Sequence, residues 1–192
     1  MCALKRRDAV PALIGEPGDF LIVAGLAGSA KDISALTLDG DNVFCLAGAM
    51  GAAAMMGLGL ALAQPRKRIL VVTGDGELLM NVGSLATIAN VNPANLSIIC
   101  VDNGRYGETG YQRSHTDGCT DLAQMAAGAG ISQIRTITHS AELDEGRQLI
   151  RESNSTSFVL LKVDASKPPA FKRNFSPCGS RMRFRTHLGL DQ

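Results

Sequence analysis

Apolar residues occur in short continuous runs separated by longer, helix-like stretches. Five runs stand out, at 20–23, 43–46, 69–72, 96–101 and 158–161. Their apolar residues are consecutive, so we expect strands that are buried on both faces. Helix-like stretches lie at 30–36, 51–63, 78–90, 121–127 and 141–152. The alternation predicts an α/β fold, a three-layer sandwich with a mainly parallel sheet covered by helices on both faces.

Residues 43–63 contain no charged side chain and are long enough to cross a bilayer. Four glycines interrupt this stretch, and its first residues are typical of a strand followed by a turn. We therefore predict a buried helix at 51–63 and no membrane segment.

Composition predicts one domain over residues 1–192, because 45% hydrophobic residues supply ample material for a single core. The formal net charge of +1 argues neither for a nucleic-acid binder nor for an acidic tail protein, and we expect no nucleic-acid partner. Five cysteines without a Cys-x-x-Cys pair indicate reduced thiols and a cytoplasmic location. The basic residues near the start lead into proline and glycine instead of an apolar core, so no secretory signal is expected.

The segment 165–192 is basic. It has no acidic residue before Asp191 and carries Lys167, Lys172, Arg173, Arg181, Arg183 and Arg185. Apolar residues are interspersed among these charges, which favours a basic amphipathic segment packed on its own domain or on a neighbouring subunit over a nucleic-acid patch.

Two polar residues follow neighbouring apolar runs. Gly74-Asp75-Gly76 closes one run, and Asn103 follows the next run 28 residues after Asp75. This spacing holds one helix and a return strand, which brings both residues to the same sheet edge. Mg²⁺ takes carboxylate and amide oxygens together with phosphates and water. The sequence predicts a metal-diphosphate site, although a helix cap and a turn asparagine are the simpler alternative.

Local sequence around Asp75 suits phosphate binding. A glycine on each side lets the backbone approach a phosphate closely, and a helix starting near Glu77 would aim free N–H groups at it. The loop Gly25 to Ser29 either adds phosphate contacts or is a plain capping loop. A loop as long as 104–120 within a compact domain is usually functional.

The segments 72–81 and 101–104 resemble the thiamin-diphosphate signature of the 2-keto acid decarboxylase superfamily. The continuation at 106–116 is similar to the diphosphate-binding (beta) subunit of sulfopyruvate and phosphonopyruvate decarboxylases. The resemblance extends from about Asp19 to about Val163 and implies the cofactors thiamin diphosphate and Mg²⁺.

The resemblance also implies roles for individual residues. The metal would be held by Asp75, Asn103 and the main-chain carbonyl of Arg105. Other cofactor contacts would come from Gly74, Gly76, Glu77, Tyr106 and Gly107. Family members often have asparagine where this chain has Asp102, which adds a nearby carboxylate.

The turn Gly48-Ala49-Met50-Gly51 resembles the one that holds the aminopyrimidine half of the cofactor. The carbonyl of Gly48 would accept a hydrogen bond from it, and Met50 would support the bent cofactor; the alternative for Met50 is a core filler. His115 is a candidate catalytic residue that could move a proton or bind an anionic substrate, with a surface loop histidine as the competing interpretation.

The implied reaction is decarboxylation of a small anionic 2-keto acid to an aldehyde, with chemistry supplied by the cofactor. In the resembled family the activating glutamate comes from a pyrimidine-binding domain, and nothing here matches that domain. We therefore expect a hetero-oligomer with a pyrimidine-binding (alpha) subunit, inactive without it. A carboligating or oxidative enzyme subunit and a catalytically silent cofactor-binding partner are the alternatives. Arg105, Arg113 or His115 could meet the substrate's anionic group.

Overall fold

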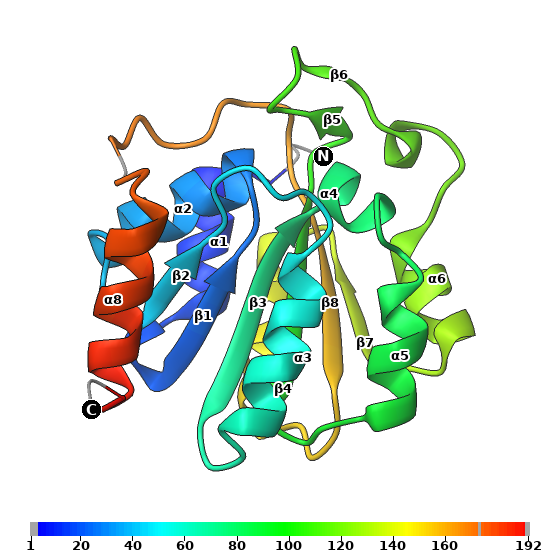
Figure 1. Cartoon of the computed structure of the whole chain (residues 1–192). Helices are drawn as coiled ribbons and strands as arrows, with labels where there is room; N and C mark the ends of the chain where they lie inside the picture. The colour runs from blue at the N-terminus through cyan, green and yellow to red at the C-terminus, as the bar shows by residue number, and fades with distance from the viewer. Residues whose placement is uncertain (1–3, 173, 191–192) are drawn as a thin grey trace.

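The computed structural model describes residues 4–172 and 174–190, so Cys2, Arg173 and Asp191 lie outside the described residues. Its main sheet contains β1 (Phe20–Ala24), β2 (Val43–Cys45), β3 (Arg68–Gly74), β4 (Leu96–Asp102), β7 (Gln133–Ile137) and β8 (Ser157–Lys162). They form the order β2-β1-β3-β4-β8-β7, and every neighbouring pair is parallel (Figure 1). A small antiparallel pair, β5 (Arg105–Tyr106) and β6 (Gln112–Arg113), lies in the loop after β4.

Helices cover both faces of this sheet. One face packs against α1 (Arg6–Ile14), α2 (Ala27–Thr37) and α7 (Leu143–Glu152), and the other against α3 (Ala53–Ala63), α5 (Ser84–Val91) and α6 (Leu122–Ala129). The short α4 (Asp75–Leu79) follows β3 directly, and α8 (Pro177–His187) is the last helix among the described residues. Single 3-10 turns occur at Pro17–Asp19, His115–Asp117 and Ser140–Glu142. The predicted three-layer α/β sandwich is confirmed.

Two separate cores explain the continuous apolar runs. In β1, Leu21 and Val23 face the core beneath α3, whereas Phe20 and Ile22 face the core beneath α1. Because successive side chains of a strand point to opposite faces, a strand covered on both sides needs apolar residues at every position.

The predicted single helix at 78–90 is wrong. The chain forms α4 and α5 instead, with a break at 80–83 where the Asn81 side-chain amide donates to the carbonyl of Gly51 at 3.0 Å. This bond joins the break to the turn before α3. The helix expected at 51–63 starts at Ala53, and α1 and β7 were not predicted at all.

The apolar stretch after β2 forms the predicted α3, packed on the sheet. A Cβ added at Gly57 would lie 2.1 Å from Cγ2 of Val71, whereas one at Gly59 would meet open space. The glycine at 57 therefore lets α3 approach β3 closely. Within the described residues, no helix is long and apolar enough to cross a membrane.

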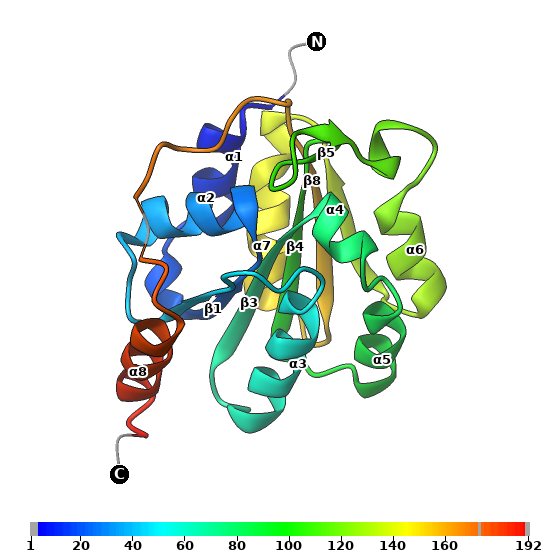
Figure 2. The same cartoon turned by 45° about the horizontal axis from the view of Figure 1, so that its top comes forward.

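The segment after β8 crosses the carboxyl ends of the strands before it reaches α8. Figures 1 and 2 show it passing over α1 and α2 to the β2 edge of the sheet. There the ring of Phe184 packs edge-on against Phe44, with centroids 6.1 Å apart. The basic segment thus packs on its own domain through its apolar side chains. The part of it that precedes α8 lies above the carboxyl ends of the strands.

Candidate functional site

A pocket of about 450 Å³ lies at the carboxyl ends of β1, β3 and β4. The residues expected from sequence that line it are Met50, Gly74, Asp75, Gly76, Glu77, Asn103, Arg105, Tyr106 and Gly107. Residues 26–29, from the end of the loop after β1 and the first turn of α2, line it as well. Gly48 and His115 do not, so their predicted roles need contacts beyond this pocket.

Asp75 is the first residue of α4 and is only 2% exposed. Its Oδ2 accepts a hydrogen bond from the Ser114 hydroxyl and another, of 3.1 Å, from the Thr116 hydroxyl. Burial raises the pKa of the Asp75 carboxyl, the Ser114 bond opposes this, and the nearby Asp102 carboxylate adds to it. A buried carboxylate with no cation beside it is costly, and a bound cation would relieve that cost.

Asp102 ends β4 and is buried next to Asp75. Its carboxylate accepts from the Thr116 hydroxyl at 2.7 Å and from the Gly104 amide at 3.0 Å. The register of β4 and β8 places Lys162 opposite Asp102, and the Lys162 ammonium lies 2.7 Å from Oδ2. Asp102, the extra carboxylate relative to the resembled family, is therefore paired with the Lys162 ammonium. The Thr116 hydroxyl lies between the carboxylates of Asp75 and Asp102 and contacts both.

Asn103 follows Asp102 at the pocket edge and is half-buried. Its side-chain oxygen accepts from the Arg105 amide at 3.1 Å, which fixes the turn that carries the Arg105 carbonyl. An amide oxygen has two lone pairs, so this bond leaves capacity for a cation.

Glu77 lies two residues beyond Asp75 and is 4% exposed. Its Oε2 accepts from the Leu26 amide at 3.0 Å and from the Thr73 hydroxyl at 3.1 Å, which ties the loop after β1 to the turn after β3. A Cβ at Gly25 would lie 1.7 Å from this oxygen. Burial raises the pKa of Glu77, opposed first by the Leu26 amide. Its other oxygen, Oε1, is buried and has no hydrogen-bond partner among the described residues.

The donors fit a metal-diphosphate group. A Cβ at Gly76 would lie 2.4 Å from the Tyr106 ring, so only glycine allows the backbone of α4 to approach the loop this closely. Across residues 4–172 and 174–190, no three His, Cys, Asp or Glu side chains are grouped to hold a metal. The predicted ligands, one carboxylate, one amide oxygen and one carbonyl, leave positions for phosphate oxygens.

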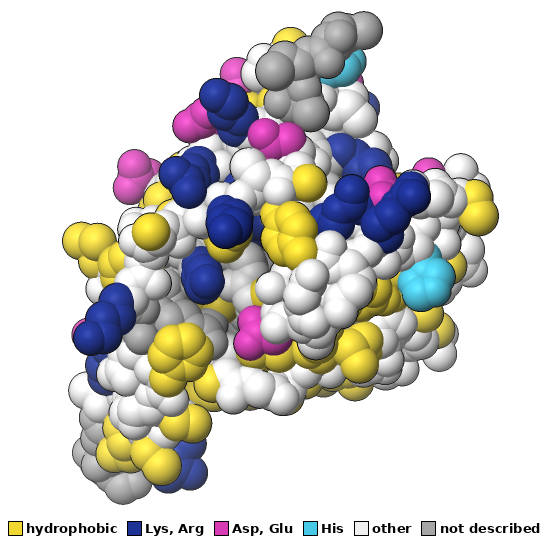
Figure 3. Space-filling model, turned by 90° about the horizontal axis from the view of Figure 1, so that it is seen from above, with side chains coloured by type: hydrophobic (Ala, Val, Ile, Leu, Met, Phe, Trp, Pro, Cys, Tyr) yellow, Lys and Arg dark blue, Asp and Glu magenta, His cyan; other side chains and the backbone are white. Residues whose placement is uncertain are grey.

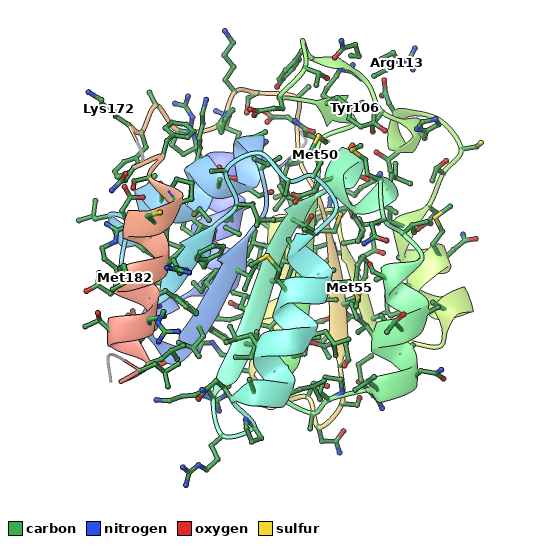
Figure 4. The ribbon with its side chains drawn as sticks, in the orientation of Figure 1. Met50, Met55, Tyr106, Arg113, Lys172 and Met182 are labelled. Carbon is green, nitrogen blue, oxygen red and sulfur yellow. The ribbon has the colours of Figure 1, made fainter. Side chains whose placement is uncertain are left out.

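The loop 104–120 forms the outer wall. Figure 4 shows Met50 and Tyr106 above the strand ends. The Tyr106 hydroxyl lies 3.5 Å from Nδ1 of His115, whose side chain is exposed. His115 therefore reaches the pocket through Tyr106. Asp117 binds both Arg105 and Arg113, and these guanidinium groups lower the pKa of its carboxyl.

Met50 lines the pocket, and it is also partly buried against the core beneath α3. Its support of a bent cofactor stays a prediction.

Ser114 and Thr116 are partners of Asp75 that no sequence signal indicates, because hydroxyl residues are common in loops. The pairing of Lys162 with Asp102 depends on the register of β4 and β8, which cannot be determined from a single sequence.

A doubly wound sheet with a pocket at its strand ends, floored by a buried carboxylate at a helix start and flanked by glycines, defines a phosphate-binding cofactor domain. Residues 37–163 match the family described as thiamine pyrophosphate enzyme, C-terminal TPP binding domain, and the chain belongs to this family.

Curated relatives match most of the chain. Sulfopyruvate decarboxylase subunit beta of Methanocaldococcus jannaschii is 37% identical over 132 residues, covering 69% of this chain and 70% of the relative. The protein of that name from Methanococcus maripaludis is 30% identical over 181 residues, covering 94% and 96%. Phosphonopyruvate decarboxylase of Streptomyces viridochromogenes is 34% identical over 185 residues, covering 95% of this chain and 46% of the relative.

A solved structure supports the fold. The crystal structure titled as that of a thiamin diphosphate-dependent enzyme of Mycobacterium smegmatis aligns with a TM-score of 0.69 at 17% identity. The alignment covers 86% of this chain and 32% of that one. At this identity the likeness concerns the fold alone.

We expect Thr116→Val to weaken Mg²⁺-dependent binding of thiamin diphosphate by about 10-fold, because partners that orient a metal ligand are typically worth 10–100-fold in affinity. Titration calorimetry of the cofactor at several Mg²⁺ concentrations measures this change. Thr120→Val, in the same loop, is the matched control. Equal affinities for the two variants would show that Thr116 does not orient Asp75.

Proposed function

We propose that the chain is the diphosphate-binding subunit of a split thiamin-diphosphate-dependent decarboxylase. The substrate is a small anionic 2-keto acid of the sulfopyruvate or phosphonopyruvate type, and the products are carbon dioxide and an aldehyde. Similarity to two subunits named beta, one along 94% of this chain, supports this. The observation that carries the proposal is the meeting of Asp75 and Asn103 at one pocket.

In this proposal Mg²⁺ binds Asp75, the side-chain oxygen of Asn103 and the carbonyl of Arg105. Both hydroxyl bonds to Asp75 are made to Oδ2, so Oδ1 would be left to hold the cation. The amides after Gly74 and in the loop after β1 hold phosphate oxygens. Bound thiamin diphosphate supplies the electron sink for loss of carbon dioxide. The loop 104–120 keeps water away from the reacting end of the pocket.

The activating glutamate comes from a pyrimidine-binding alpha subunit, and the active site lies between unlike chains. His115 acts on the substrate side, where its bond to Tyr106 orients the imidazole. The Gly48 carbonyl contacts the aminopyrimidine beyond the present pocket. A cytoplasmic location fits the free thiols of Cys100, Cys119 and Cys178.

A second candidate is an oxidative or carboligating enzyme subunit, because one cofactor platform supports several reactions. The 2-oxoglutarate synthase subunit KorB of Methanocaldococcus jannaschii is 26% identical over 187 residues, covering 90% of this chain and 66% of the relative. Decarboxylation is favoured because the decarboxylase relatives have a higher percentage identity to this chain, 37%, 30% and 34%, than the 26% of KorB.

Purification of the native complex, followed by assay with sulfopyruvate, phosphonopyruvate and pyruvate, tests the function. We expect carbon dioxide and the matching aldehyde in equal amounts from the complex and almost none from this chain alone. Turnover by the isolated chain would contradict the split enzyme. An acyl-CoA or a longer keto acid as the product would support the second candidate.

A further inference from the structure

One wall of the pocket carries positive charge from three separate parts of the chain. Arg7 comes from α1, Lys31 from α2, and Lys167 from the segment that crosses the strand ends, and all three line the pocket. Figure 3 looks down on this face and shows Lys and Arg side chains gathered there. The acidic lining residues are Asp75 and Glu77, which are buried, and Glu108 on the rim. The pocket is thus acidic at its floor and mainly basic along this wall.

These three cations are not neutralised by the protein. Within the described part of the chain, no acidic group lies within ion-pair distance of Arg7, Lys31 or Lys167. The neighbouring Arg6 differs, because its guanidinium is buried against Asp32 with Nε–Oδ2 and Nε–Oδ1 distances of 3.1 and 3.3 Å. Asp32 is therefore paired with Arg6. Burial raises the pKa of Asp32, and the Arg7 charge, without an ion pair, has only the smallest of the effects that lower it, so the charge on the wall remains in excess.

The wall is held in place by hydrogen bonds that do not neutralise it. The Arg7 guanidinium donates to the carbonyls of Lys167 and Pro168, each at 3.3 Å. The Tyr111 hydroxyl donates to the carbonyls of Ala165 and Ser166, the latter at 3.3 Å. These bonds hold the main chain of the crossing segment beside the pocket, so Lys167 projects from a fixed backbone position close to Arg7. Fixing the backbone in advance lowers the entropy cost of binding an anion there.

We propose that Arg7, Lys31 and Lys167 form a subsite for a tetrahedral oxyanion within the pocket, separate from the metal ligands. This inference rests on the proposed function, and it assigns to these residues the recognition of a sulfonate, phosphonate or phosphate group. The group comes either from the head of the keto acid or from the outer phosphate of the cofactor. Ammonium and guanidinium groups suit such oxyanions because they donate several charged hydrogen bonds.

The test uses Arg7→Gln, Lys31→Gln and Lys167→Gln in the assembled complex, with Lys172→Gln as the matched control. Lys172 is in the same segment, does not line the pocket, and lies at the outer side in Figure 4. Two readouts are taken. Calorimetry measures binding of thiamin diphosphate, ethanesulfonate and methylphosphonate in the presence of Mg²⁺, and kinetics compares KM for sulfopyruvate or phosphonopyruvate with KM for pyruvate.

If the substrate's head group occupies the subsite, each pocket substitution raises KM for the sulfonated or phosphonated acid about 10-fold, in line with loss of one charged hydrogen bond. KM for pyruvate and the affinity for the cofactor then stay unchanged. If the cofactor's phosphate occupies it, cofactor affinity falls by a similar factor and KM ratios stay constant. Changes below twofold in all readouts, or an equal effect from Lys172→Gln, would overturn the subsite.

Failure of the proposed function is a different result. A wild-type complex that releases no carbon dioxide from any keto acid would reject the decarboxylase. The probe anions would still bind with affinities that depend on Arg7 and Lys167, because that binding needs no turnover.

Discussion

Replacing Asp75 with asparagine is expected to weaken Mg²⁺-dependent binding of thiamin diphosphate by about 100-fold or more, about 3 kcal/mol. The substitution keeps the shape of the side chain and an oxygen that can accept from Ser114 and Thr116, but it removes the anionic metal ligand. Calorimetry with saturating Mg²⁺ measures the loss. Glu108→Gln, which neutralises another carboxylate lining the same pocket, controls for the change in charge. Unchanged affinity in the Asp75 variant would remove Asp75 from the metal site.

The same substitution is expected to stabilise the cofactor-free chain at neutral pH. The pKa of the Asp75 carboxyl is raised in the folded state, so between its unfolded and folded pKa values the folded chain binds more protons. Stability is therefore lost as pH rises through this window, and the cost is complete above the folded pKa. Removing the buried charge with asparagine therefore raises Tm at pH 7, by about 2–4 °C for each kcal/mol of unfolding free energy gained.

Thermal unfolding at pH 7 and at progressively lower pH separates the effect of the Asp75 charge from a gain in stability that does not depend on pH. The gain of the asparagine variant over wild type is expected to shrink as the pH falls and Asp75 takes up its proton. A gain that stayed constant with pH would show that the buried charge is not its cause.

Gly57→Ala is expected to destabilise the chain, because overpacking a core usually costs about 1–3 kcal/mol. The added methyl group would lie 2.1 Å from Cγ2 of the fully buried Val71, so α3 or β3 must shift. This cost exceeds the gain of about 1 kcal/mol in helix propensity when alanine replaces glycine.

Gly59→Ala is the matched control, because it makes the same change in the same helix where the new methyl group meets open space. It is expected to stabilise by about 0.5–1 kcal/mol from helix propensity alone. Urea unfolding of both variants measures the contrast. Two changes of the same sign would contradict the close approach of α3 to β3.

The sequence predicted the strands that are buried on both faces, because complete burial demands an unbroken apolar run. It did not predict β7, whose residues Gln133, Arg135 and Thr136 are polar because an edge strand is partly exposed. The division between α4 and α5 was also missed, since the hydrogen bond from Asn81 to Gly51 joins residues far apart in the chain.

The site was predictable to the same extent. Asp75 and Asn103 each follow a recognisable strand, and the carboxyl ends of parallel strands meet at one edge. Lys162 could not be assigned, because its place opposite Asp102 depends on the register of β4 and β8. Arg7, Lys31 and Lys167 come together only through the path of the crossing segment, which no local pattern encodes.

The hydroxyl bonds from Ser114 and Thr116 to Asp75 have a consequence for assembly. They couple the position of the loop 104–120 to the cation, and such coupling is reciprocal by thermodynamic necessity. An alpha subunit that stabilises this loop against Asp75 would raise the affinity for Mg²⁺, and Mg²⁺ would raise the affinity for the alpha subunit by the same factor. Depleting magnesium would then loosen the quaternary structure as well as the cofactor.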